Sequence, residues 1–227
     1  MSDVSGDTFR GRPSNRSFKL RGVRGTPAQA DAYEKQWALF GVDKELDLDL
    51  PTLFQDSKRY IVEIGTGMGE ATAIIAERFP ETGFLTFEVH VPGVGALLNK
   101  ITNKGLTNVR IVQDDARVFL DQHLADHCLD GVHLYFPDPW PKRKHHKRRI
   151  VQPDFIELLS RKLKPGGYWH IATDWVPYAE WIEELVNQNP NFSGGEIIKP
   201  EFRPTTRFEG QGITKGHRVT DLWYLKK

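Results

Sequence analysis

The sequence has few of the features that secreted and membrane proteins need. Its 227 residues include one cysteine, Cys128, so no disulfide can form within the chain, and no second cysteine is present to bind a metal with it. The chain contains no run of about 18 apolar residues, the length of a membrane span, and its amino terminus lacks the apolar stretch of a signal peptide. We therefore expect a soluble protein of a reducing, cytoplasmic compartment, without a membrane partner.

The chain also has almost no overall charge. Its 31 Lys and Arg nearly balance its 30 Asp and Glu, which leaves a net charge of +1 at pH 7. Only local charge clusters can therefore indicate a partner. The length is sufficient for one sizeable hydrophobic core but not for two. The amino-terminal residues are rich in Ser, Gly, Asp and Arg without apolar periodicity, so we predict a flexible polar leader over residues 1–20 and a single domain over residues 21–227.

Apolar runs alternate with amphipathic stretches through this domain. Strand-like runs lie at 60–64, 84–88, 109–112, 131–136 and 168–173. Helical patterns lie at 27–37, 71–79, 94–104, 115–123, 153–163 and 175–188, and a last strand-like run at 219–225. Strands that alternate with helices predict an α/β fold with a doubly wound sheet.

A glycine-rich turn, Gly65-Thr66-Gly67-Met68-Gly69, lies between the first predicted strand and the first helix of the alternating pattern. Without side chains at Gly65 and Gly67, backbone amides can approach a ligand at the start of that helix. Such turns bind nicotinamide, flavin and S-adenosylmethionine cofactors alike. The spacing G-x-G-x-G differs from the dinucleotide fingerprint G-x-G-x-x-G and so argues against a nicotinamide cofactor.

Acidic residues near the ends of three strands favour S-adenosylmethionine. Glu88, about 20 residues after the glycine turn, is placed to accept hydrogen bonds from ribose hydroxyls. Asp115 can hold an adenine amino group, with Asp114 as an alternative for that role. Glu63 can face the ammonium group of the cofactor, a charge that nicotinamide dinucleotides lack. The other interpretation makes Glu88 and Asp115 helix caps or solvent-facing acids.

A proline-rich segment, residues 136–141 (Phe-Pro-Asp-Pro-Trp-Pro), follows the fourth predicted strand. Its position places the carboxylate of Asp138 at the carboxyl edge of the sheet, beside the glycine turn. Each proline fixes its own φ and restricts the residue before it, so the loop is predicted to present Asp138 and Trp140 in fixed directions. Rigid positioning suits methyl transfer, which needs little proton chemistry. The alternative is a plain turn with a buried tryptophan.

A basic run follows immediately and carries six fixed positive charges within residues 142–149. Such a run is typical either of a solvated surface or of a phosphate-binding surface, and its position beside the Asp138 loop favours RNA. His145 and His146 are adjacent, which is poor spacing for one metal ion, and no cysteine or acidic cluster completes a site. We predict no metal.

Two segments near the carboxyl terminus are candidates for substrate recognition. Asp174 ends the fifth predicted strand, although an aspartate before a helix is also a common cap. Residues 203–210 (Arg-Pro-Thr-Thr-Arg-Phe-Glu-Gly) combine hydroxyl, cationic, aromatic and acidic side chains. Guanine offers N1 and N2 donors to a carboxylate, so this chemistry suits recognition of a base edge. The alternative is an ordinary surface loop.

Taken together, these motifs resemble the bacterial tRNA (guanine-N7-)-methyltransferases of the TrmB family. The resemblance covers roughly residues 20–227 and rests on residues 62–70, 136–142, 147–149, 172–174 and 206–209. It implies a Rossmann-like class I methyltransferase fold, with a doubly wound, mostly parallel sheet and an antiparallel C-terminal strand. It also implies methyl transfer from S-adenosylmethionine to N7 of guanine in tRNA, usually guanine 46 of the variable loop.

The resemblance also assigns roles to residues, with Asp138 as the catalytic residue. The cofactor would be bound by Glu63, Gly65, Gly67, Glu88, Asp115 and Asp138. The substrate would be contacted by Lys142, Asp174, Thr206, Arg207, Phe208 and Glu209. RNA contacts would come from Lys144, His145, His146, Lys147, Arg148 and Arg149. One departure is Gln211, where the family often has a basic residue, which weakens one expected RNA contact. We infer no obligatory protein partner and expect a monomer or a homodimer.

Three other functions compete with this one. An exocyclic-amine methyltransferase is the first, because Pro137-Asp138-Pro139-Trp140 resembles the acid-Pro-Pro-aromatic motif of such enzymes, although only one proline follows the acid here. The second is a catalytically silent RNA-binding module that uses the basic run. A nicotinamide oxidoreductase is the third, and both the glycine spacing and the lack of a hydride-transfer constellation disfavour it.

Overall fold

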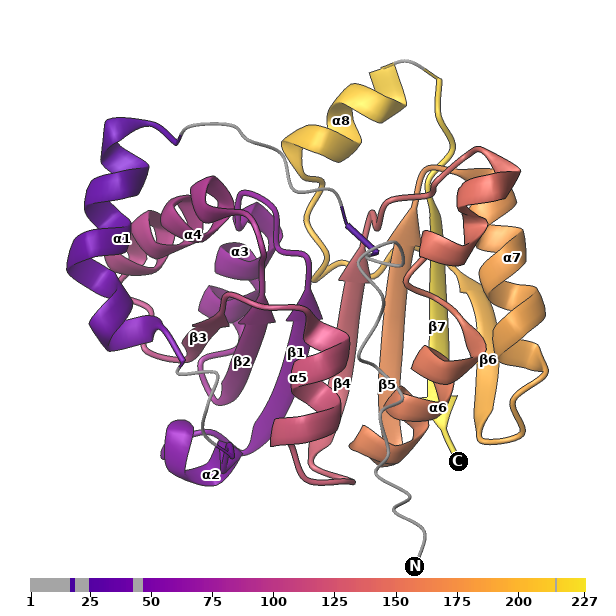
Figure 1. The fold of residues 1–227 in the computed structure, drawn as a ribbon, viewed down its shortest axis with the longest axis horizontal. Helices are drawn as coiled ribbons and strands as arrows, with labels where there is room; N and C mark the ends of the chain where they lie inside the picture. The colour runs from indigo at the N-terminus through magenta and orange to yellow at the C-terminus, as the bar shows by residue number, and fades with distance from the viewer. Residues whose placement is uncertain (1–16, 19–24, 43–46, 215) are drawn as a thin grey trace, which may run out of the picture.

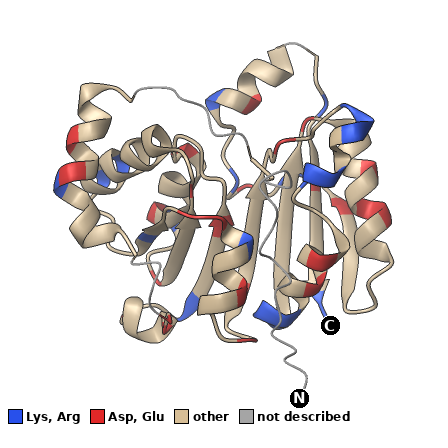
Figure 2. Cartoon of the chain, viewed as in Figure 1, with Lys and Arg blue, Asp and Glu red and all other residues tan. Residues whose placement is uncertain are grey.

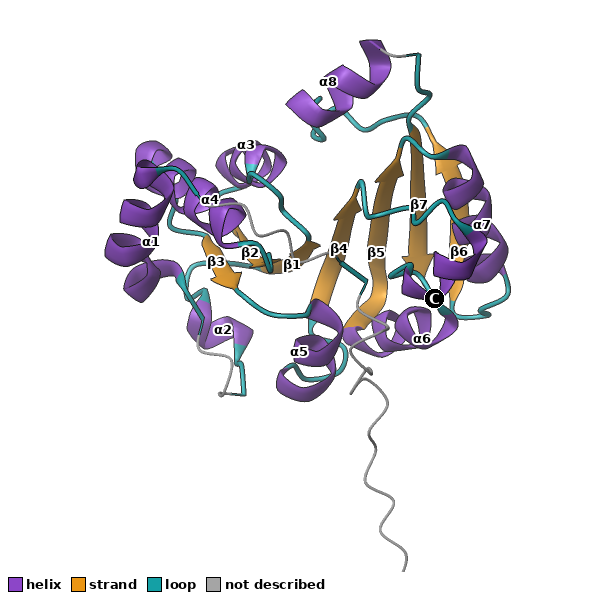
Figure 3. Ribbon diagram, turned by 45° about the horizontal axis from the view of Figure 1, so that its top comes forward, coloured by secondary structure: helices purple, strands orange, loops and turns teal. Residues whose placement is uncertain are grey.

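The computed structural model describes residues 17–18, 25–42, 47–214 and 216–227 (Figure 1). The predicted leader over residues 1–20 lies outside the described residues, apart from Ser17 and Phe18. The remaining residues form three layers, with a central sheet between two layers of helices (Figure 3).

The sheet has seven strands in the order β3-β2-β1-β4-β5-β7-β6. Their bounds are β1 Arg59–Ile64, β2 Thr82–Phe87, β3 Val109–Val112, β4 Leu129–Tyr135, β5 Leu163–Thr173, β6 Phe192–Ile197 and β7 Thr220–Lys226. The pairs among β1 to β5 are parallel, and β7 is antiparallel to both of its neighbours. This confirms the predicted doubly wound, mostly parallel sheet with an antiparallel C-terminal strand. The winding reverses between β1 and β4, where such sheets bind ligands.

Two apolar cores lie on the two faces of the sheet. One face packs against α1 (Pro27–Phe40), α3 (Glu70–Arg78) and α4 (Val91–Lys104). The other packs against α5 (Ala116–His123), α6 (Pro153–Lys162), α7 (Val176–Asn187) and residues of the short helix α2 (Leu50–Leu53). Because both faces of β1, β2 and β3 are covered, these strands read as nearly continuous apolar runs.

The first helix begins with a capping box, which fixes its start and its packing on α4. The Gln29 amide donates to the Thr26 hydroxyl over 3.3 Å, and the Thr26 amide donates to the Gln29 side chain over 2.7 Å. A side chain at Gly95 would collide with the Gln29 backbone oxygen, so glycine permits the close approach of α4 to α1. The helix predicted over residues 27–37 therefore exists and runs three residues further.

Two elements lie where only links and loops were predicted. Strand β6 contains Gly194 and Gly195, and glycine both weakens a strand and removes the alternation by which strands are predicted. A side chain at Gly194 would collide with the Trp223 backbone on β7, which explains the glycine there. Helix α8 (Arg207–Thr214) includes two glycines and few apolar residues, so its sequence does not show helical periodicity.

The basic run forms a 3₁₀ helix, η2 (Arg143–Arg148), at the carboxyl edge of the sheet. In Figure 2 its Lys and Arg are blue, close to the start of α7. Within the described part of the chain, none of the helices is long and apolar enough to cross a membrane.

Candidate cofactor and substrate site

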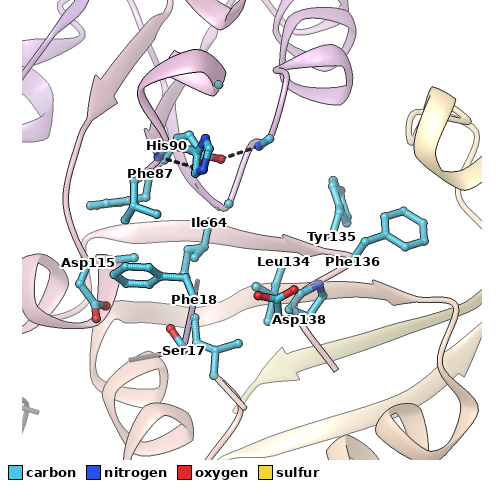
Figure 4. Close-up of a pocket in the computed structure, with 18 of the residues that line it drawn as sticks. Ser17, Phe18, Ile64, Phe87, His90, Asp115, Leu134, Tyr135, Phe136 and Asp138 are labelled. Atoms are coloured by element: carbon cyan, nitrogen blue, oxygen red, sulfur yellow. Dashed lines mark hydrogen bonds between the residues drawn. The ribbon is translucent and has the colours of Figure 1, made fainter. Parts of the chain in front are cut away.

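A cavity of about 460 Å³ opens at the carboxyl ends of β1, β2 and β4, at the reversal of the winding. Its volume lies within the range of small-molecule and cofactor sites. Figure 4 shows the side chains around it. Of the six predicted cofactor residues, the structure brings five to this cavity: Gly65, Gly67, Glu88, Asp115 and Asp138.

The glycine turn forms one wall of the cavity. Gly65 and Gly67 have φ values of +75° and +56°, in the left-handed region that favours glycine. A side chain at either position would meet no atom within 4 Å, so both glycines border open space. The backbone of this turn is therefore accessible to a ligand at the start of α3, as the sequence predicted.

Glu88 connects the glycine turn to the segment that follows β2. Its two carboxylate oxygens accept hydrogen bonds from the Gly67 amide over 2.7 Å and from the His90 amide over 2.8 Å. Burial raises the pKa of this carboxyl. Each oxygen retains a second lone pair, so Glu88 can hold the turn in place and still accept a ribose hydroxyl.

Asp115 caps a helix and also lines the cavity. It caps α5, since its Oδ1 accepts from the Arg117 amide over 3.0 Å, and its Oδ2 pairs with the Arg117 guanidinium at 2.9 Å. It also lines the cavity, as does Asp114. The helix cap is thus observed, and both aspartates remain candidates for contact with an adenine amino group.

Glu63 does not reach the cavity, in contrast to the prediction. Its side chain is 3 % exposed on β1, between β2 and β4, and it is absent from the cavity wall. Its Oε2 has no hydrogen-bond partner, and burial raises the pKa of this carboxyl to about 7. The position of Glu63 along the strand accounts for the difference, because Glu63 is enclosed between β2 and β4 whereas Ile64, the last residue of β1, reaches the cavity at the carboxyl edge.

The buried carboxyl of Glu63 makes the stability of the ligand-free protein depend on pH. In the unfolded chain it ionises near pH 4.5, so between that pH and about 7 the folded state binds more protons and stability falls as the pH rises. We expect Glu63→Gln to be as stable as the wild type at pH 4 and more stable than the wild type by about 3 kcal/mol at pH 8.

Urea unfolding at the two pH values measures this difference. Glu77→Gln, which changes an exposed carboxylate of α3, is the matched control and is expected to show no pH-dependent gain. If Glu63→Gln raised the free energy of unfolding equally at pH 4 and pH 8, ionisation of the Glu63 carboxyl would not be the source of the increase.

The loop that carries Asp138 is held from several sides. Phe136 and Trp140 both have positive φ values, +52° and +44°. The Trp140 indole donates to the Ser17 carbonyl over 3.1 Å, and the Arg149 guanidinium donates to the Pro139 carbonyl over 2.9 Å. Asp138 is half-buried and lines the cavity. Trp140 is only 4 % exposed, so it anchors the loop, as in the alternative of a buried tryptophan, and is not presented to a substrate.

The basic run divides into exposed and buried side chains. Lys142, Arg143, Lys144 and Lys147 are exposed, whereas the guanidinium of Arg148 lies over the Trp140 ring at 4.9 Å. His145 and His146 are half-buried, and their rings pack against Trp140 and Trp181 respectively.

Arg149 differs from its predicted role as an RNA contact. It is 2 % exposed, and its guanidinium lies over the rings of Tyr178 and Trp181 as well as donating to Pro139. In this structure Arg149 therefore joins the Asp138 loop to α7 and does not face the surface.

The predicted substrate residues lie on and around α8, which bridges the carboxyl edge of the sheet. At its start the Arg207 amide donates to Glu70 on α3 over 2.7 Å, and the Phe208 ring, 59 % exposed, meets Phe136 edge to face at 5.5 Å. Near its end, Oδ2 of Asp174 lies 3.0 Å from Nδ1 of His217. The helix thus extends from the glycine turn across the Asp138 loop to Asp174.

Two of the predicted substrate residues at the start of α8 have less access to a substrate than expected. Glu209 is 2 % exposed and ion-paired with Arg203 at 2.7 Å, so its carboxylate is occupied within the protein. Thr206 is half-buried, and its hydroxyl accepts from the Glu209 amide over 3.2 Å at the start of the helix. Arg207 and Phe208 are the exposed members of the predicted set on this helix.

Among the residues to which the sequence analysis gave no role are two at the cavity, Ser17 and Phe18, and one in the segment before α8, Arg203. Ser17 and Phe18 line the cavity, and in the view of Figure 4 Phe18 lies between Asp115 and Asp138. The only available signal was a single aromatic residue within a polar segment, which periodicity cannot detect. Arg203 lay in the segment considered for recognition but was given no role. Among the described residues, no three His, Cys, Asp or Glu lie close enough to hold a metal ion.

The chain is similar to characterised families in both sequence and structure. Residues 57–222 match a family described as putative methyltransferase. A tRNA (guanine-N(7)-)-methyltransferase of Streptomyces avermitilis is 47 % identical over 99 % of this chain and 79 % of that protein. One from Nitrosospira multiformis is 47 % identical over 93 % of this chain and 94 % of its own length.

Solved structures share the fold at low identity. The 16S rRNA methyltransferase KamB aligns with a TM-score of 0.56 at 12 % identity, over 78 % of this chain and 92 % of its own. The aminoglycoside resistance methyltransferase NpmB1 aligns with a TM-score of 0.53 at 18 % identity, over 82 % and 94 %. With the fold of methyltransferases and relatives of nearly half-identical sequence along its length, this chain belongs to the tRNA (guanine-N(7)-)-methyltransferase family.

Proposed function

We propose that this protein transfers a methyl group from S-adenosylmethionine to N7 of guanine 46 in the variable loop of tRNA. The observation that carries the proposal is the position of Asp138, which lines the cofactor-sized cavity on a loop followed directly by the exposed cations of η2. The names of the relatives support guanine N7 and tRNA. A tRNA substrate also supports a cytoplasmic location.

The cavity fits the proposed cofactor. Open space borders Gly65 and Gly67, and the acids at its wall match a ribose and an adenine amino group. When bound there, S-adenosylmethionine supplies an electrophilic methyl group on a positively charged sulfur. Glu88 would accept from the ribose hydroxyls, and Asp114 or Asp115 from the adenine amino group.

The chain's own residues would then act mainly by positioning the guanine. N7 already carries a lone pair, so the attack needs no general base. The purine gains positive charge as its N7 is methylated, and the carboxylate of Asp138 would orient the base and stabilise that charge. The exposed cations of η2 would bind the phosphates on either side of the target nucleotide.

The rival exocyclic-amine methyltransferase is less well supported by the structure. In that motif an exposed aromatic ring holds the flipped base beside the acid. Here the aromatic residue of the motif, Trp140, is 4 % exposed and its indole donates to a backbone carbonyl. It cannot stack on a base without leaving the position that holds the loop.

Mapping of the methylated nucleotide tests the proposed position. 7-Methylguanosine makes RNA cleavable by aniline after borohydride reduction, so a tRNA transcript treated with the protein and cofactor is expected to break at nucleotide 46 alone. A transcript with adenosine at position 46 is the matched control and is expected to remain intact. Cleavage at another guanosine would refute position 46 while leaving N7 methylation in place.

Phe18 gives a test of the cofactor site itself. Because its ring lines the cavity, Phe18→Ala is expected to raise the Kd of S-adenosylmethionine about tenfold through lost apolar contact. Isothermal calorimetry measures the change, with Leu39→Ala, an exposed apolar side chain of α1, as the control. An unchanged Kd would show that the ring does not contact the bound cofactor.

A further inference from the structure

The half of the sheet formed by β4, β5 and β7 has a polar face beneath the segment that leads to α8. Helices α6 and α7 pack on the opposite face. On the polar face, His133 and His170 are fully buried, and the ring of Phe202 lies 5.9 Å from one and 5.8 Å from the other. The segment that contains Phe202 and Arg203 therefore takes the place that a helix takes elsewhere.

Arg203 is the centre of this buried polar region. Its side chain is 1 % exposed, and its guanidinium makes two bidentate pairs. It donates to both oxygens of Asp221 on β7 over 2.7 and 2.8 Å, and to both oxygens of Glu209 on α8 over 2.7 and 3.0 Å. Only a planar fork of donors can make both pairs at once, so lysine could not replace this geometry.

The same guanidinium is connected to the Asp138 loop. It lies 5.7 Å from the ring centre of Phe136 and 5.8 Å from that of Tyr135, the last residue of β4. Through Asp221 a hydrogen-bonded chain continues to His170 at 2.8 Å and from His170 to the Tyr135 hydroxyl at 3.0 Å. Arg203 thus touches both the helix above the substrate site and the start of the loop below it.

These contacts determine which side chains of α8 point away from the protein. Lys199 also donates to Glu209, over 3.1 Å, so both oxygens of this carboxylate are bound within the protein. Phe208, the residue before it, is consequently held outward with its ring against Phe136. A change in the Arg203 pair would release the helix at this residue.

We propose that Arg203 is a positioning residue for methyl transfer, which holds α8 and Phe208 in place over the Asp138 loop by joining Glu209 to Asp221. This inference rests on the proposed function and adds a residue and a role to it. Arg203 is 1 % exposed and does not line the cavity, so its role is exerted through Glu209 and Asp221. Its effect is on the orientation of a guanine that the η2 cations have already brought to the site.

Arg203→Met tests the inference, with Lys162→Met as the matched control. Lys162 is also a buried cation, 3 % exposed, that donates to the Leu124 carbonyl over 2.6 Å and pairs with Asp126 at 2.8 Å. It lies at the end of α6, at the opposite edge of the sheet. Both variants lose a buried cation and its hydrogen bonds, so both are expected to be less stable, and they are compared at a temperature at which each is folded.

Turnover, tRNA affinity and amide exchange are measured on both variants. For Arg203→Met we expect kcat to fall about 10- to 100-fold, because a displacement of about 1 Å at a reacting group has that effect, while the Kd of tRNA changes less than about threefold. Amides of α8 are expected to exchange faster only in this variant. Arg203→Lys keeps the positive charge but loses the planar set of donors of the guanidinium. Its kcat and its α8 exchange rates are expected to lie between those of Arg203→Met and those of the wild type.

A double variant tests the route of the effect. If Arg203 acts through Phe208, then Arg203→Met with Phe208→Ala loses no more turnover than the more damaging single change. Multiplied losses would overturn the inference, and so would α8 exchange equal in the two methionine variants. Turnover is measured as total methyl incorporation into tRNA. The comparison of the variants therefore still holds if the methylated guanosine is not nucleotide 46. Absence of any transfer by the wild type would refute the proposed function, and the exchange result would still decide the role of Arg203.

Discussion

Asp138→Ala is expected to lower kcat for tRNA methylation at least about 100-fold at saturating cofactor. Asp138 is the carboxylate on the rigid loop between the cavity and η2, and its side chain lines the cavity wall. Loss of one preorganised group that stabilises charge in the transition state typically costs about 10²- to 10³-fold. Methyl transfer at limiting enzyme, with excess cofactor and tRNA, measures the effect.

Asp138→Asn separates orientation from charge stabilisation. The amide keeps the shape of the side chain and one acceptor oxygen but removes the negative charge. If the kcat of Asp138→Asn lies between those of Asp138→Ala and the wild type, its loss relative to the wild type is assigned to the missing charge. Asp154→Ala is the control, since this carboxylate is exposed at the start of α6. Wild-type turnover in Asp138→Ala would exclude Asp138 from catalysis.

Removal of the exposed cations of η2 is expected to affect binding instead of turnover. With Arg143, Lys144 and Lys147 all changed to alanine, we expect the Kd of tRNA at moderate salt to rise about 10- to 100-fold. The slope of log Kd against log salt should fall by about 2 to 3, roughly one for each lost phosphate contact. The Kd of S-adenosylmethionine should not change, because none of the three lines the cavity.

The structure also defines the control for this variant. Three other lysines lie at the opposite edge of the sheet, and each is paired with an acid. They are Lys58 just before β1, Lys104 at the end of α4 and Lys164 near the start of β5. Their triple alanine variant removes the same charge. If the Kd of tRNA rose equally in both triple variants, the total charge of the protein, and not the position of the η2 cations, would be responsible for the loss of affinity. Arg148 is left in place because its guanidinium packs on Trp140.

Much of the fold follows from patterns in the sequence. The strands β1 to β5 are predictable because buried parallel strands give short apolar runs, and the helices between them have one apolar face. Element β6 and helix α8 are not predictable in this way. Their glycines and polar residues conceal both periodicities, and their conformation depends on contacts with β7 and with Arg203.

The candidate site was predictable by position but not by burial. Strand ends and turns placed Glu88, Asp115 and Asp138 correctly at one edge, because parallel strands share that edge. The residue types of Glu63, Arg149 and Glu209 suggested ligand contacts, yet all three are buried within the protein. Which side of a strand or loop a charged side chain occupies depends on tertiary partners, such as Arg203 for Glu209, that spacing along the chain does not reveal.

The most direct test of the central claim is the identity of the methylated nucleoside. Bulk unmodified tRNA is incubated with the protein and S-adenosylmethionine, digested to nucleosides and analysed by mass spectrometry. The account predicts 7-methylguanosine in the wild-type reaction and its near absence in the Asp138→Ala reaction. N6-methyladenosine as the product, or no methylated nucleoside from the wild type, would contradict it.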